Sequence, residues 1–172
     1  MTEQSLTVQQ VLRYANHDFL NHLHLIKMNL DLERIEEAKE LIYDIVAQCQ
    51  NVSQLNKIGL PKMIEYLQTL RWRYPEFQME FSTNITKALN EQWDELIVQY
   101  LEETILHVYD RLDPFSEQQL QIDIVGAGDE FEITVHFTGQ FNEALHFNKE
   151  LNALQIKTLE QTTTSWKFVM QN

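Results

Sequence analysis

The sequence is poor in the residues that interrupt regular secondary structure. Its 172 residues include only four glycines and three prolines, which is below average usage and predicts long regular elements, helices above all. No stretch approaches the roughly 18 consecutive apolar residues of a membrane span. The N-terminus lacks the basic start and apolar block of a signal peptide. We therefore expect a cytoplasmic protein that has no membrane partner.

Cysteine and basic residues are also scarce. The single cysteine, Cys49, can form neither a disulfide framework nor a cysteine-based zinc site within one chain. Because Cys49 occupies an apolar helical position, we expect it to be a small core residue. Asp and Glu number 26 against 13 Lys and Arg, which gives a net charge of −13. This balance repels phosphate backbones and makes nucleic acids poor partners.

Two amphipathic helices are predicted in the N-terminal third, because apolar residues recur there at spacings of three and four. The two connected stripes consist of Val8, Leu12, Ala15, Phe19, Leu23, Ile26 and Leu30, followed by Ile35, Ala38, Ile42, Ile45, Cys49 and Val52. The short connection predicts an antiparallel hairpin, with Asp31 as a candidate cap of the second helix. Such a hairpin cannot cover both stripes alone. Their near-heptad spacing favours a homodimer in which two hairpins form a four-helix bundle.

The pattern changes at "NKIGLPK", where Gly59 and Pro61 are expected to end one helix and begin the next. Beyond this point we predict helices at 61–74 and 90–112, a short strand at 77–83, and a β-hairpin from alternating segments at 120–124 and 131–137. Two further strands are predicted around "QTTTS". The fold class is therefore α+β. A helical hairpin domain at 1–58 precedes a C-terminal domain at 59–172 with a small sheet backed by helices.

The first helix carries two histidines on its polar side, and His17 is the one that points most directly away from the apolar stripe. At 100° per residue, His17 points away from the centre of the apolar stripe. His22 lies nearer the apolar side, where a buried histidine with a satisfied hydrogen bond is the ordinary explanation. The residues within about 40° of His17 are Arg13, Asn21, His24 and Met28.

Several chemical roles are conceivable for His17, although an exposed histidine on a helix most often has no special function. Zinc binding with His24 is disfavoured because seven residues separate the rings by about 10 Å along the axis. A hydrolytic triad is disfavoured because no serine or cysteine is placed beside an imidazole. A phosphoryl carrier fits better, since an ordinary histidine pKa near 6.5 leaves the ring mostly neutral at pH 7. Asn21 can donate to phosphoryl oxygens, and Asp18 can orient the ring.

The run "HDFLNHLHLIKMNL" resembles the phosphoacceptor helix of the sporulation-initiation phosphotransferases of endospore-forming bacteria. Citrate-type sensor histidine kinases carry a similar helix. The positions that match the family pattern are His17, Asp18, Phe19, Leu20, Asn21, Leu23, Leu25, Ile26, Lys27, Asn29 and Leu30.

The resemblance implies a dimeric phosphotransferase of a phosphorelay in sporulation initiation. In this family the histidine accepts a phosphoryl group from the aspartate of one response regulator and donates it to the aspartate of a second. His17 would be the acceptor, supported by Asp18 and Asn21, and no cofactor is implied on this chain, since Mg²⁺ sits in the regulator. Asn16 departs from the basic residue that the family often has there. The implied contact surface for the regulator comprises Arg13, Leu20, His24, Lys27 and Met28.

The second half resembles a degenerate ATP-binding domain of a histidine kinase. His107 stands where such kinases need a magnesium-binding asparagine, and Gly139 is the one glycine left of an adenine-binding box, between Phe137 and Phe141. We therefore expect phosphoryl transfer without use of ATP. Two alternatives remain: a non-catalytic dimeric docking module for a regulator or kinase, and a degenerate sensor-type histidine kinase that still binds ATP.

Overall fold

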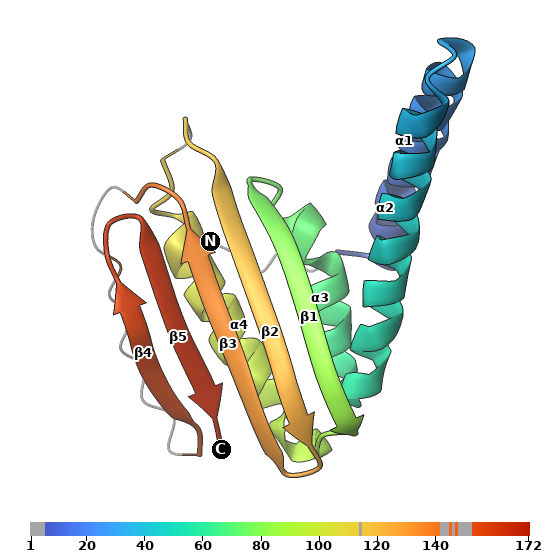
Figure 1. Cartoon of the computed structure of the whole chain (residues 1–172). Coiled ribbons are helices and arrows are strands. Elements are labelled where there is room, and N and C mark those ends of the chain that lie inside the picture. Colours follow the sequence, from blue (N-terminus) through green and yellow to red (C-terminus); the bar gives the residue numbers. More distant parts are fainter. Residues whose placement is uncertain (1–5, 114, 142–144, 146, 148–152) are drawn as a thin grey trace. The chain divides into compact units, whose positions relative to one another are not determined.

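The computed structural model describes residues 6–113, 115–141, 145, 147 and 153–172. The chain divides into two compact units, Met1–Ser53 and Gln54–Asn172, and each is described by itself. Helices come first and a mixed five-stranded sheet follows, so the predicted α+β class is confirmed (Figure 1). The functional division predicted at residue 58 stays a prediction.

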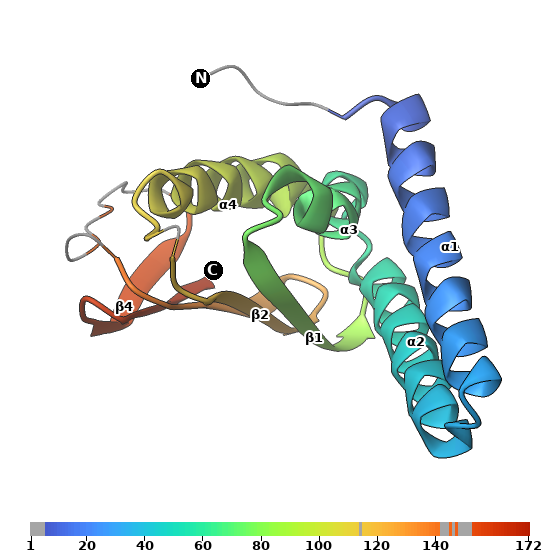
Figure 2. The ribbon, with the colours of Figure 1, turned by 90° about the horizontal axis from the view of Figure 1, so that it is seen from above.

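The first unit is a helical hairpin. Helix α1 (Val8–Asp31) and helix α2 (Ile35–Leu55) run side by side and are joined by a three-residue connection (Figures 1 and 2). A capping box starts α1: the hydroxyl of Thr7 accepts from the backbone N–H of Gln10, whose side chain accepts from the backbone N–H of Thr7. In the connection, Glu33 adopts a positive φ of 58°.

Asp31 does not cap the second helix, so that prediction is wrong. It is the last residue of α1, and its carboxylate accepts a hydrogen bond from Nζ of Lys27 one turn earlier. The physical reason is the length of α1, which continues through the position where the connection was expected. In α2, Glu36 and Glu37 place negative charge in the first turn, where the helix dipole favours it.

Most of the predicted apolar stripe is exposed in the single chain. Most side chains that are partly or fully buried on α1 lie on a different side, including Val11, Tyr14, Asp18, His22 and Asn29, and Ile26 is the one member of the α1 stripe among the partly buried residues. The large apolar residues of the two stripes that remain exposed are Val8, Leu12, Phe19, Leu23, Leu30, Ile35 and Ile42. Cys49 is exposed as well. The expectation that Cys49 is a core residue is therefore wrong for one chain, because Ala38 of the same stripe is buried in the hairpin but Cys49 is left open to solvent.

The second unit is a sheet covered by helices on one face (Figure 2). The strand order is β1-β2-β3-β5-β4; β1 runs parallel to β2, and all other neighbours are antiparallel. Its elements are two short 3-10 helices (Asn56–Ile58 and Glu91–Trp93), α3 (Pro61–Arg73), β1 (Phe77–Lys87), α4 (Asp94–Tyr109), β2 (Gln118–Ala127), β3 (Glu130–Thr138), β4 (Gln155–Gln161) and β5 (Ser165–Gln171).

All the strands predicted in the second half are present, and β1 is longer than expected. The helix predicted at 90–112 is shorter, because its start is a 3-10 turn and the helix ends at Tyr109. Gly59 adopts a left-handed φ of 79°, and a Cβ there would lie 2.7 Å from Cβ of Ala88. Pro61 is the first residue of α3. The helix boundary predicted at "NKIGLPK" is therefore confirmed.

The core lies between the sheet and its two helices. The inward residues of β2 and β3 are fully buried: Leu120, Ile122, Ile124, Ile133, Val135 and Phe137. They alternate with polar residues on the outer face of the sheet, as the sequence predicts. Asp94, at the start of α4, fixes the start of α3 because its carboxylate accepts from the backbone N–H groups of Lys62 and Met63, both at 2.8 Å. This contact joins the two helices that cover the sheet.

Candidate functional site

His17 lies near the middle of α1 and is open to solvent. Its side chain is 71% exposed. The helix is continuous on both sides of it, so residues three and four positions away share its face. His17 also lies off the outward apolar stripe, as the helical wheel predicts. Within the helical hairpin, the imidazole is therefore not covered and is accessible to a partner protein.

Two side chains contact the same ring nitrogen of His17. Nδ2 of Asn21, one turn further along α1, lies 3.2 Å from Nδ1 of His17. Oδ1 of Asp18 lies 3.5 Å from the same Nδ1, and the Asp18 side chain is 40% exposed. The structure therefore brings together the three residues predicted to form the reactive centre, and neither contact involves Nε2.

The two contacts select different tautomers of the imidazole. Asn21 donates to Nδ1 only when that nitrogen has no proton, whereas Asp18 accepts from Nδ1 only when the nitrogen carries one. In the tautomer that Asp18 favours, the proton is on Nδ1 and the lone pair is on Nε2. That tautomer gives the ring a nucleophilic nitrogen outside both contacts.

The residues predicted to contact a regulator are all exposed on α1: Arg13, Leu20, His24, Lys27 and Met28. The guanidinium of Arg13 lies 5.3 Å from the ring centroid of Tyr14, and Lys27 forms an ion pair with Asp31. Along α1 the charges of Arg13 and Lys27 balance those of Asp18 and Asp31, whereas the whole chain carries −13. The charge of α1 is therefore less negative than that of the chain as a whole.

His22 is partly buried, in keeping with the structural role expected for it. Among the described residues, no three His, Cys, Asp or Glu side chains gather closely enough to hold a metal ion. None of the described helices is both long enough and apolar enough to cross a membrane.

The C-terminal unit has packed side chains at the positions that resemble a kinase nucleotide site. The ring of His107 on α4 lies 5.3 Å from the ring of Phe147, and Phe147 lies 5.7 Å from the ring of Tyr100. A Cβ on Gly139 would lie 1.7 Å from Oε1 of Gln118, so a buried glutamine side chain occupies the space beside this glycine. Gly139 thus has a packing role in this structure.

Gln118 is a residue that sequence reasoning missed. Its Nε2 donates to the backbone carbonyl of Asp113 and to Oγ of Ser116. No local pattern signals this role, because a glutamine at the start of a strand is ordinary and its contact with Gly139 depends on the pairing of β2 with β3.

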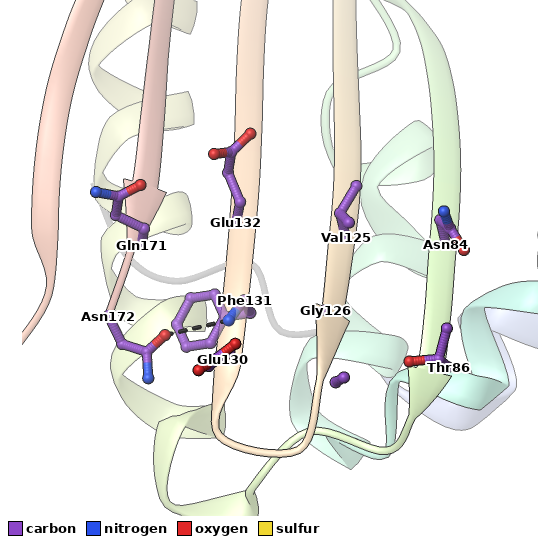
Figure 3. Close-up of a pocket in the computed structure, with 10 residues that line it drawn as sticks. Asn84, Thr86, Val125, Gly126, Glu130, Phe131, Glu132, Gln171 and Asn172 are labelled. Atoms are coloured by element: carbon purple, nitrogen blue, oxygen red, sulfur yellow. Dashed lines mark hydrogen bonds between the residues drawn. The ribbon is translucent and has the colours of Figure 1, made fainter.

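An open hollow lies on the outer face of the sheet, remote in sequence from His17 (Figure 3). Its lining residues come from four strands and the C-terminus: Asn84, Thr86, Val125, Gly126, Ala127, Glu130, Phe131, Glu132, Gln171 and Asn172. Asn172 accepts from the backbone N–H of Phe131 at its rim. Because two glutamates line the hollow and no basic residue does, it is unsuited to a phosphate.

Comparison with known proteins places the similarity mainly in the helical hairpin. Residues 1–58 match the family model described as the Sensor_kinase_SpoOB-type, alpha-helical domain. Over 71 residues the chain is 28% identical to sporulation initiation phosphotransferase B of Bacillus subtilis (strain 168); this segment is 41% of the present chain and 37% of the relative. The chain thus matches well under half the length of this curated relative.

Two solved histidine kinases also show similarity. The blue-light activated histidine kinase EL346 of Erythrobacter litoralis has a TM-score of 0.44 and 12% identity, covering 99% of this chain and 61% of its own. The histidine kinase AdeS of Acinetobacter baumannii has a TM-score of 0.40 and 9% identity, covering 90% of this chain and 96% of its own. The resemblance predicted from the motif around His17 is confirmed by the family model and the curated relative: residues 1–58 are similar to SpoOB-type alpha-helical domains, and a 71-residue segment of the chain is similar to a sporulation initiation phosphotransferase.

Proposed function

We propose that this protein is a phosphotransferase of a sporulation phosphorelay, with His17 as its covalent phosphoryl carrier. The similarity of the N-terminal helices to a SpoOB-type domain supports a phosphotransferase or kinase-related role. The observation that carries the finer proposal is the exposed imidazole of His17 with Asp18 and Asn21 beside it. The two substrates are response regulators, each carrying phosphate on an aspartate.

The proposed reaction uses Nε2 of His17 as the nucleophile. Nε2 attacks the phosphorus of the regulator's aspartyl phosphate, an N–P bond forms, and the P–O bond to the aspartate carboxylate breaks. The carboxylate leaves as an anion, and the proton stays on Nδ1, where Asp18 stabilises the positive charge that develops on the ring. The second half-reaction reverses these steps with the carboxylate of the other regulator. Such a transfer depends mainly on positioning and charge compensation.

Asn21 has a second use in this reaction. Its amide lies on the same face as the ring, so it can turn from Nδ1 to donate to a phosphoryl oxygen. The Mg²⁺ that neutralises the phosphoryl oxygens belongs to the regulator's acidic pocket. Arg13 and Lys27 add positive charge on the docking surface, together with the apolar contacts of Leu20 and Met28.

We further propose that the active form is a homodimer. The outward stripe of α1 and α2 exposes many large apolar side chains, including Phe19, Leu23 and Ile42. A contiguous apolar face of this kind needs a partner in water. A second hairpin offers the same stripe, and the two together make a four-helix bundle that leaves His17 outside the seam.

The decisive experiment incubates the chain with a response regulator phosphorylated on its aspartate. We expect an acid-labile, base-stable phosphoprotein, and we expect His17→Gln to abolish it while the oligomeric state stays the same. His24→Gln is the matched control for the labelled residue. His24 is also exposed on this side of α1, and because it lies on the docking surface this variant is tested at saturating regulator, where it should still become labelled. Phosphoryl transfer that survives in His17→Gln would overturn the assignment.

A non-catalytic docking module is the second candidate, and the size of the exposed apolar stripe favours it as well. The same experiment separates the two, because a docking module binds the regulator without becoming labelled. Titration with millimolar ATP and Mg²⁺ tests the remaining alternative, a degenerate kinase that binds nucleotide.

A further inference from the structure

The second unit has one long strand edge with little of the usual protection. Among the described strands, β1 lies at one end of the sheet and pairs with β2 alone, in a register that is unbroken from Phe77 to Ile85 and irregular only at its end, between Ile85 and Lys87. This stretch contains no proline and no lysine, and its single charge is Glu80. The opposite edge strand, β4, is shorter and has a register irregularity between Thr158 and Glu160. Edge strands of folded proteins normally carry such irregularities or charges to prevent further pairing.

The inward side chains of β1 are also incompletely covered. Met79, Phe81 and Ile85 are only partly buried. The residues beside them on β2, such as Leu120 and Ile122, are fully buried. Another strand placed beside β1 would cover these apolar side chains and satisfy the free backbone groups of the edge.

We propose that the outer edge of β1, which no other described strand of its unit covers, pairs with β1 of a second copy of this chain, antiparallel and centred on Ser82. Two identical strands related by a two-fold axis must run antiparallel. In this register, Met79 faces Ile85 of the other copy on the inner side, which joins two apolar residues. On the outer side, Glu80 of each copy faces Asn84 of the other copy. The interface therefore contains two identical pairs of a carboxylate and an amide donor.

Charge repulsion disfavours a register centred on Glu80. In that register the Glu80 carboxylates of the two copies would lie directly opposite each other, which is destabilising. Centring on Ser82 opposes two small hydroxyl side chains instead, and it pairs the residues of the regular stretch from Met79 to Ile85 with one another on the same face of the sheet. The strand is thus complementary to itself. The resulting interface lies within Gln54–Asn172 and uses no residue of the phosphoryl-transfer site.

The first test is disulfide trapping in the full-length chain. Ser82→Cys is made in a Cys49→Ser background, which removes the one native thiol. Directly opposed strand residues lie within disulfide reach, so we expect Ser82→Cys to form covalent dimers at least tenfold faster than Gln155→Cys on the exposed edge strand β4. Equal rates for the two variants would indicate random collision and overturn the proposal.

The second test is a charge swap in the same trapping assay. Adding Asn84→Glu should slow the cross-linking at least tenfold, because the introduced carboxylate would face Glu80 of the other copy. Combining it with Glu80→Lys should restore the rate by making a salt bridge across the interface. Gln155→Glu, the same kind of chemical change on β4, should have no effect.

Hydrogen exchange identifies other occupants of the edge. Slow exchange of the β1 amides without cross-linking of Ser82→Cys would mean that a different segment or another protein covers this edge, and would overturn pairing with a second copy. A cross-linking rate that is unchanged by Asn84→Glu would also overturn it. The phosphorylation of His17 is independent of these outcomes, so failure here leaves the proposed function intact.

Discussion

Nδ2 of Asn21 lies 3.2 Å from Nδ1 of His17, one helical turn away on the exposed side of α1. The contact holds the ring next to an amide donor, and we propose that this amide also donates to the transferred phosphoryl group. The same ring nitrogen is 3.5 Å from Asp18. Variants of Asn21 and Asp18 test how each side chain affects the reactivity of His17.

Replacing Asn21 with alanine is expected to slow phosphorylation of His17 by roughly tenfold to a hundredfold, the scale of losing one donor to developing charge. Docking should change little, because the amide acts on the phosphoryl group. Single-turnover transfer from a phosphorylated regulator measures the rate, and a binding titration measures the Kd. Met28→Ala serves as the comparison, since it should weaken binding instead. A Kd that rises in parallel with the loss of rate in Asn21→Ala would contradict this role.

Replacing Asp18 with alanine is expected to shift the His17 tautomer. Without the carboxylate, Nδ1–H loses its acceptor while the Asn21 donor remains, so the proton moves towards Nε2. Fewer molecules then offer a lone pair at Nε2, and transfer slows. The ¹⁵N chemical shifts of the imidazole report the tautomer directly. Unchanged shifts together with a slower transfer would show that Asp18 acts in another way.

A charge placed in the outward apolar stripe is expected to separate the homodimer. Leu23→Glu puts a carboxylate among the side chains that we propose to be buried between two hairpins, which is costly without a paired cation. Sedimentation at micromolar concentration should show monomers when Leu23→Glu is combined with Asn84→Glu, which blocks the proposed pairing of β1. Tyr43→Glu in the same Asn84→Glu background is the control, because Tyr43 is exposed on α2 away from the stripe. Dimers that persist when Leu23→Glu and Asn84→Glu are combined would place the interface elsewhere.

The carboxylate of Asp94 is expected to be important for the stability of the second unit. Asp94→Ala removes the acceptor for the backbone N–H groups of Lys62 and Met63 at the start of α3. Leaving two such donors unpaired should lower the free energy of unfolding by about 2 to 4 kcal/mol. Urea unfolding measures this change. Glu95→Ala, next in sequence, removes only an exposed ion pair with Lys62 and should cost less than about 1 kcal/mol.

Stability of the second unit is expected to fall at alkaline pH. Burial raises the pKa of Tyr100 from 10.0 to about 12, and burial also raises the pKa of Tyr66. A raised folded-state pKa means that the unfolded chain loses its protons first, so the stabilisation is complete below pH 10 and declines as the pH rises towards 12. Urea midpoints between pH 8 and 11.5 measure this decline, and Tyr100→Phe should make it smaller.

Much of the fold followed from local patterns. The spacing of apolar residues predicted both helices of the hairpin, and alternation predicted β2 and β3 with their buried faces. Gly59 and Pro61 marked the start of α3, because a left-handed turn and an N-terminal proline are local requirements. The prediction failed for Cys49 and Asp31. A helical wheel shows which side is apolar, but it does not show which neighbour covers that side.

The sequence by itself determined the polar face that carries His17 and the residues that accompany it, because a regular helix converts spacing directly into position. Only the tertiary structure decided which side of α1 the hairpin covers, the parallel pairing that leaves β1 at an edge, and the packing of Gln118 against Gly139. These features depend on contacts between residues far apart in the chain, and local propensity carries no information about such contacts.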